Sequence, residues 1–136
     1  MPTSPKSLRL RPALRAEIER IAKRSRRSFS EVAQDLLEEA LRIRVCPGIY
    51  FADEPAGRVA KVAGTGLGVW EIIRDYLAEG AEKVKEALPQ VGEAELKAAL
   101  MYYKRYRQEI DSEIAENAAL TPEAVEARYP GLLRKV

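Results

Sequence analysis

Apolar and polar positions at the start of the chain follow first the period of a strand and then that of a helix. Residues 7–11 alternate between polar and apolar side chains, as a half-buried strand does. The apolar face of this strand carries Leu8 and Leu10, and the other face carries Ser7, Arg9 and Arg11. Pro12 suits a first helical turn, and an apolar stripe at helical spacing follows it. The stripe consists of Leu14, Ile18, Ile21 and Ala22.

A second helix is predicted to start just after Ser28. The run from Ser28 to Glu31 has the spacing of a capping box, in which these two residues cap each other's backbone N–H groups. A second apolar stripe follows, and Pro47 and Gly48 end the unit. This stripe consists of Phe29, Val32, Ala33, Leu36, Leu37, Ala40 and Leu41.

These three elements are too short to form a stable core on their own. A unit of roughly 45 residues buries too little surface, and one strand leaves its backbone groups unpaired on both edges. Two chains that pair their strands and interlock their helices remove both defects, so we expect an obligate dimer. The expected dimer core consists of Leu8, Leu10, Leu14, Ile18, Ile21, Phe29, Val32, Leu36 and Leu37.

The second part of the chain predicts a small β-hairpin and three helices. Residues 49–62 read as two short strands around a turn, and the glycines at 64, 66 and 68 read as a close-packed turn. Their spacing is not that of a dinucleotide-binding loop, and no P-loop Lys follows. A helix begins at Val69 with Trp70, Ile73 and Leu77 on one stripe, and Gly80 ends it.

A short helix over 83–88 and a long helix over 93–119 complete this outline, which is that of a helix-turn-helix module. The apolar stripe of the long helix consists of Leu96, Leu100, Tyr103, Ile110 and Ile114. We therefore predict a mainly α chain with a domain at 1–46, a trihelical domain at 47–120 and a tail at 121–136. Thr121 and Pro122 indicate a short helix at the start of the tail.

Composition and charge narrow the function. The chain has no His and a single Cys, Cys46, which excludes imidazole catalysis, His metal sites and an internal disulfide. No apolar run is long enough to span a membrane, no signal peptide is visible, and we expect a cytoplasmic protein without metal or cofactor. The scarcity of Asn and Gln, with many charges, is a thermophile tendency.

The net charge of +2 is unevenly distributed. Residues 1–27 hold nine basic and two acidic side chains, so this segment carries +7 and the remainder −5. A strongly basic segment favours a polyanion as partner, although a solubilising arm is the alternative.

With this charge, the strand and two helices resemble the ribbon-helix-helix DNA-binding domain over about residues 6–45. The resemblance implies an intertwined dimer whose two-stranded ribbon enters the major groove, with Ser7, Arg9 and Arg11 reading base edges. It also implies phosphate binding at the start of the second helix, by Ser28, Phe29 and Ser30, beside Lys6 and Arg27 of the basic segment. The family usually has Gly where this chain has Arg26, so either Arg26 is left-handed or the turn differs.

Residues 50–110 resemble a small family of homeodomain-like proteins, many of which are assigned as VapB-type antitoxins. The resemblance rests on residues 62–65, 69–70, 88–91 and 96–100, although the family often has Arg where this chain has Gly66. It implies a partner toxin of the PIN ribonuclease type. The candidate toxin-binding residues are Tyr102, Tyr106, Arg128, Tyr129, Leu132, Leu133 and Arg134.

Together these patterns favour a dimeric, sequence-specific DNA-binding protein that acts as antitoxin and autorepressor of a toxin–antitoxin pair. One alternative is a protein-interaction module that uses the ribbon only to dimerise. The other is a small magnesium-dependent or carboxylate enzyme, but the acidic residues lack the paired spacing that such chemistry requires.

Overall fold

The chain folds into two compact units, Met1–Arg42 and Ile43–Val136. The computed structural model describes residues 3–55, 57–119, 123, 126–127 and 130–131. Their secondary structure is mainly helical, with one small antiparallel sheet, in agreement with the predicted class. The division between the units falls four residues before the predicted boundary at residue 46, inside the second helix.

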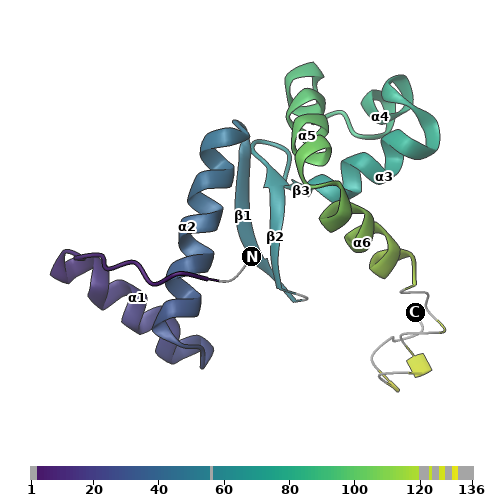
Figure 1. The fold of residues 1–136 in the computed structure, drawn as a ribbon. Helices are drawn as coiled ribbons and strands as arrows, with labels where there is room; N and C mark the ends of the chain where they lie inside the picture. The colour runs from purple at the N-terminus through teal and green to yellow at the C-terminus, as the bar shows by residue number, and fades with distance from the viewer. Residues whose placement is uncertain (1–2, 56, 120–122, 124–125, 128–129, 132–136) are drawn as a thin grey trace. The chain divides into compact units, whose positions relative to one another are not determined.

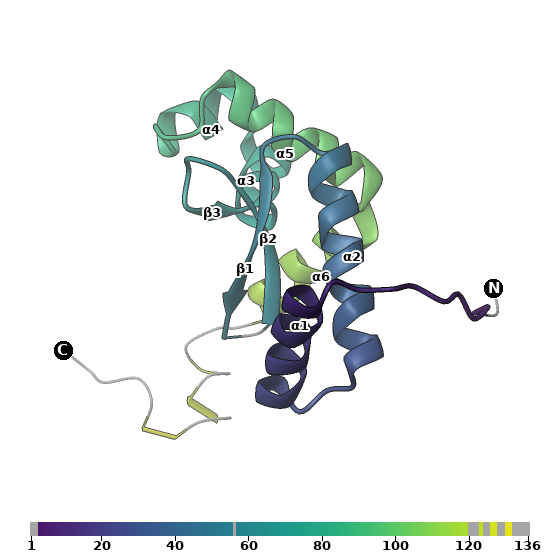
Figure 2. The same cartoon turned by 90° about the vertical axis from the view of Figure 1, so that its left-hand side faces the viewer.

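The first unit contains helix α1 (Pro12–Ser25) and helix α2 (Phe29–Val45) as far as Arg42, and a tight turn joins the two helices (Figure 1). Both helices begin where the sequence predicts, α1 with Pro12 in its first turn. The predicted strand over residues 7–11 is not formed in the single chain, and residues 3–11 run as an extended trace with neither helix nor strand (Figure 2). A strand is defined by hydrogen bonds to a neighbouring strand, and the neighbour predicted for residues 7–11 belongs to a second copy of the chain.

The core of the first unit is small. Three side chains are buried, namely Ile18, Ala22 and Val32. Four half-buried side chains pack around them: Leu10, Ile21, Phe29 and Ala33. The other leucines of the predicted dimer core are exposed, and Leu41 of the same stripe is exposed with them. Their exposed fractions are 70% for Leu8, 50% for Leu14, 38% for Leu36, 56% for Leu37 and 65% for Leu41.

The second unit begins with the predicted hairpin, which is confirmed. Strands β1 (Ile49–Glu54) and β2 (Gly57–Val62) pair antiparallel, and β3 (Leu67–Gly68) pairs with β2 to give the order β1-β2-β3. The turn between β2 and β3 is tight because Gly64 and Gly66 take left-handed φ angles of 81° and 71°. The buried Thr65 hydroxyl donates to the Val62 carbonyl at 2.7 Å and accepts the Leu67 N–H at 3.0 Å. This glycine-rich loop is the predicted close-packed turn.

Between residues 63 and 119, all of which the structure describes, four helices follow the hairpin where the sequence predicts three. They are α3 (Val69–Glu79), α4 (Ala81–Ala87), α5 (Glu93–Arg105) and α6 (Arg107–Ala118). Helix α3 is central: it packs against α4, α5 and α6 and against strands β2 and β3. Within the described ranges no helix is long and apolar enough to cross a membrane.

The core of the second unit is larger than that of the first. Val69, Ile72 and Ile73 of α3 are fully buried, as are Tyr102 of α5 and Ile110 of α6. Cys46 belongs to the same core, 1% exposed. This core therefore forms within one copy of the chain and, among the described residues, contains thirteen buried side chains, against three in the first unit.

The long helix predicted over 93–119 is wrong in one respect: it breaks at Tyr106. Tyr106 has φ −125° and ψ 44°, outside the helical region, and α6 restarts at the next residue. The rings of Tyr102 and Tyr106 pack with centroids 4.7 Å apart, and the Tyr102 hydroxyl bonds to Glu109 across the break. Side-chain contacts between neighbouring turns thus span the break, and neither Pro nor Gly marks it in the sequence.

Candidate nucleic-acid interface

The turn between α1 and α2 is held by a residue with a left-handed backbone. Arg26 has φ 56° and ψ 40°, the one positive φ found at a non-glycine position in the described residues. The N–H of Arg27 donates to the Ala22 carbonyl at 3.0 Å, and the N–H of Arg26 donates to the Lys23 carbonyl at 3.4 Å. These two bonds form a Schellman motif, which glycine usually closes. Of the two alternatives for this turn, the left-handed Arg26 is therefore confirmed.

The predicted capping box starts α2. The Ser28 hydroxyl accepts the Glu31 N–H at 3.1 Å and donates to the Glu31 carboxylate at 2.9 Å. The Ser28 N–H donates to the same carboxylate at 3.3 Å. These hydrogen bonds to Ser28 lower the pKa of Glu31 below its usual value.

The predicted phosphate site requires backbone N–H groups at the start of α2 that have no acceptor. Glu31 N–H is capped by Ser28, and Val32 N–H bonds to the Ser28 carbonyl at 3.1 Å. For the N–H groups of Phe29 and Ser30, no acceptor is found within the described part of the chain. Two donors at a positive helix end suit a phosphate oxygen.

Arg27 next to this helix start is an ion-paired side chain. Its Nη1 lies 2.5 Å from the Asp35 carboxylate, and its Nη2 lies 3.7 Å from Glu31. The hydrogen bond to Asp35 raises the pKa of Arg27. Arg27 remains 42% exposed, so Asp35 orients its guanidinium at the surface beside Ser28.

The predicted base-reading residues lie on the extended segment before α1. Ser7, Arg9 and Arg11 are exposed, as is Lys6. Their neighbour Leu10 packs on the core of the first unit and so anchors the end of the segment closest to α1. The structure brings the basic segment, the capped start of α2 and Arg27 into one unit of the chain.

The predicted dimer core divides into two sets. Ile18 and Val32 are buried within one copy, and Leu10, Ile21 and Phe29 are half-buried against them. Leu8, Leu14, Leu36 and Leu37 are exposed. With Leu41, five leucines are thus exposed in a unit of about 40 residues. Apolar side chains that adjoin one another at a surface mark a protein contact.

One candidate for toxin binding is corrected. Tyr102 is 0% exposed, and its ring meets Phe51 edge-on with centroids 6.4 Å apart. It is a core residue, whereas Tyr103, predicted to lie in the core, is half-buried with its hydroxyl 2.8 Å from Asp111. The reason is the register of α5: the buried stripe runs through Leu96, Ala99 and Tyr102. Tyr106 is half-buried and also packs on the core.

The remaining candidates for toxin binding lie outside the described residues. They are Arg128, Tyr129, Leu132, Leu133 and Arg134. The predicted helix start at Thr121 and Pro122 lies outside them as well.

Sequence reasoning missed two features of the first unit. One is Asp35, which lies one helical turn beyond Glu31 and orients Arg27. Eight residues separate Asp35 from Arg27, beyond the i,i+4 spacing at which helical ion pairs form, so no sequence pattern signals this pair. The other is a basic face on α1, formed by Arg20, Lys23 and Arg24, whose charges add to the net charge without revealing that they share a helix face.

Comparison with known proteins adds no further constraint: no protein-family model matches the chain, and no curated protein or solved structure shows significant similarity to it.

Proposed function

We propose that the chain is a dimeric, sequence-specific DNA-binding protein in which residues 7–11 of two copies pair as a ribbon. The observation that carries this proposal is the exposed leucine surface of the first unit, next to an extended basic segment. A second copy that covers Leu8, Leu14, Leu36, Leu37 and Leu41 also supplies the missing strand neighbour.

In this proposal Arg9 and Arg11, with Ser7, project from the ribbon toward base edges in the major groove. Arginine donates two hydrogen bonds to guanine O6 and N7, a pairing that separates guanine from the other bases. The N–H groups of Phe29 and Ser30, with Arg27 beside them, hold a phosphate and fix the register of the ribbon on the duplex.

We further propose that the protein is the antitoxin and transcriptional autorepressor of a toxin–antitoxin pair with a PIN-type ribonuclease. The support is the resemblance of residues 50–110 to a family with many VapB-type antitoxins. In this arrangement the first unit binds the operator, and the second unit with the tail binds the toxin.

The test of DNA binding is fluorescence anisotropy with the duplex upstream of the gene, compared with a random duplex. We expect Arg9→Ala to lose roughly 1–3 kcal/mol of binding free energy on the specific duplex, with a much smaller loss on the random one. Arg44→Ala is the matched control, because this exposed arginine lies outside the first unit. If Arg9→Ala binds both duplexes as the unchanged protein does, the ribbon does not read bases.

The same exposed leucines also favour a second function, a protein-interaction module that dimerises without binding DNA. The two functions differ at low salt, where phosphate contacts are strongest. If the dimer binds neither duplex at low salt in the anisotropy measurement, the result supports the interaction module.

A further inference from the structure

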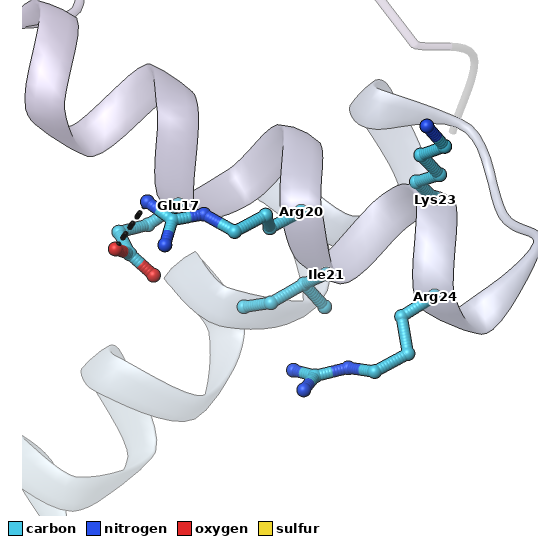
Figure 3. A pocket seen from close by; sticks show the side chains of 5 residues that line it. All are labelled: Glu17, Arg20, Ile21, Lys23 and Arg24. Carbon is cyan, nitrogen blue, oxygen red and sulfur yellow. Dashed lines mark ion pairs between the residues drawn. The ribbon is translucent and has the colours of Figure 1, made fainter.

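A basic face on α1 forms a shallow pocket outside the interface described above (Figure 3). Glu17, Arg20, Ile21 and Arg24 have the i, i+3, i+4, i+7 spacing of one helix face, and Lys23 lies beside them. The pocket has a volume of about 430 Å³. Three cations and one carboxylate line it, so it carries a net positive charge.

Two of the three cations have no acidic partner within the described residues. Arg20 forms an ion pair with Glu17, with 2.6 Å between Nη2 and Oε1. For Lys23 and Arg24 the described part of the chain supplies no ion pair. Both side chains are exposed, so their charges are available to a ligand.

The shape of this pocket does not suit a small molecule. Small-molecule sites are enclosed and mainly apolar. Here side chains of a single helix form the whole lining, and Ile21 is its one apolar member. A half-buried isoleucine between arginine side chains matches the sugar-phosphate backbone of a nucleic acid, in which phosphates alternate with deoxyribose (Figure 3).

The position of the pocket in the first unit supports the same ligand. Lys23 and Arg24 lie in the last turn of α1, and the left-handed Arg26 turn leads directly from them to the capped start of α2. In the sequence, only the short turn around Arg26 therefore separates the basic face from the proposed phosphate site at Phe29 and Ser30. A duplex that runs along both sites is bound by a continuous row of phosphate contacts.

We propose that Arg20, Lys23 and Arg24, around Ile21, bind the phosphodiester backbone of the DNA that flanks the bases read by the ribbon. This inference rests on the proposed DNA-binding function and deepens it. The face adds affinity and length of site without reading sequence. The added contacts make binding more sensitive to salt.

The test is a salt titration of DNA binding by the full chain with the double variant Lys23→Gln/Arg24→Gln. We expect roughly tenfold weaker binding at low salt to specific and random duplexes alike, and a salt slope reduced by about 2. The preference for the specific duplex is unchanged. On a duplex trimmed to the bases under the ribbon, the variant and the unchanged protein bind equally.

The matched control is Lys83→Gln/Lys85→Gln, which removes the same charge from α4 in the second unit. This control is expected to keep the salt slope. Thermal unfolding followed by circular dichroism verifies that all variants fold, since the altered side chains lie on helix surfaces.

Each outcome separates this inference from the function on which it rests. If the unchanged protein binds DNA with a preference that Arg9→Ala removes, but Lys23→Gln/Arg24→Gln keeps the full salt slope, only the basic face on α1 is wrong. If the double variant alters self-association and leaves DNA binding unchanged, the face contacts protein and the inference is overturned. If the unchanged protein binds no duplex at low salt, both proposals fail.

Discussion

The hydroxyl of Tyr102 donates a 2.5 Å hydrogen bond to the carboxylate of Glu109, across the break between α5 and α6. Tyr102 is fully buried, while Glu109 lies in the first turn of α6. A buried hydroxyl requires an acceptor, and a charged acceptor gives a strong bond. This pair therefore fastens α6 to α5 at the point where the backbone leaves the helical conformation.

Tyr102→Phe is expected to lower the free energy of unfolding by about 1–2 kcal/mol, because the ring stays packed and only the bond to Glu109 is lost. The matched control is Tyr103→Phe, which removes an exposed hydrogen bond to Asp111 and should cost less than about 0.5 kcal/mol. Urea unfolding followed by circular dichroism measures both. Equal losses of unfolding free energy for the two variants would show that the buried bond to Glu109 stabilises the fold no more than the exposed bond to Asp111 does.

Glu113 on α6 makes stability depend on pH. Desolvation, with the nearby charges of Glu109 and Glu116, raises the pKa of Glu113 from 4.5 to about 7. The folded protein therefore retains a proton that the unfolded chain releases, so stability is full below pH 4.5 and falls as pH rises to about 7. Above pH 7 the free energy of unfolding stays at this lower value.

Glu113→Gln removes this titration. The variant is expected to match the unchanged protein near pH 4.5 and to exceed its free energy of unfolding by roughly 1 kcal/mol above pH 7, with allowance for solvent screening at this half-buried site. Urea unfolding at a series of pH values measures the difference. A difference that stays constant across the series argues against a proton on Glu113.

Arg26→Gly is expected to stabilise the first unit. The left-handed φ of Arg26 costs roughly 1 kcal/mol of backbone strain, and glycine at this position does not have this strain. Part of this gain is lost because glycine is more flexible in the unfolded chain, so we expect a net gain of about 0.5 kcal/mol. Arg26→Val, which is β-branched, should destabilise instead, and hydrogen exchange at α1 measures both. A loss of protection with glycine would mean that the Arg26 side chain itself holds the turn.

Leu37→Glu tests the proposed dimer. Leu37 is 56% exposed, so the change costs little within one copy, but a charge in the covered surface would prevent association. We expect a monomer by size-exclusion chromatography with light scattering. Leu77→Glu is the control, because Leu77 is equally exposed on α3 of the second unit. An unchanged mass for Leu37→Glu would exclude this surface from the dimer.

The local elements of the chain follow from local sequence signals. The capping box of Ser28 and Glu31 forms as its spacing predicts, and the hairpin follows its two β-rich runs. The left-handed Arg26 is one of the two alternatives that the family resemblance leaves open, since Gly usually stands at this turn, and the structure selects it. These features depend on contacts between residues close in sequence, which a pattern encodes directly.

The structure of the second unit differs from the prediction where contacts between residues distant in sequence determine which side chain is buried. Tyr102 and Tyr103 are adjacent and chemically alike, and the packing against Phe51 selects which one is buried. The break at Tyr106 was missed for a different reason, because neither Pro nor Gly marks it in the sequence. The basic face on α1 was hidden for another reason: a sum of charges does not say which of them share a helix face.

The exposed leucines of the first unit have a consequence for how the protein responds to its own abundance. In the proposed dimer, a second copy completes the core around Ile18 and Val32, so mass action governs that unit: each tenfold dilution weakens it by about 1.4 kcal/mol. The second unit completes its core within one copy and is insensitive to dilution. At low protein concentration the first unit, which we propose binds DNA, would therefore unfold before the second. The folding equilibrium of this unit would then set the release of the operator, without a separate ligand.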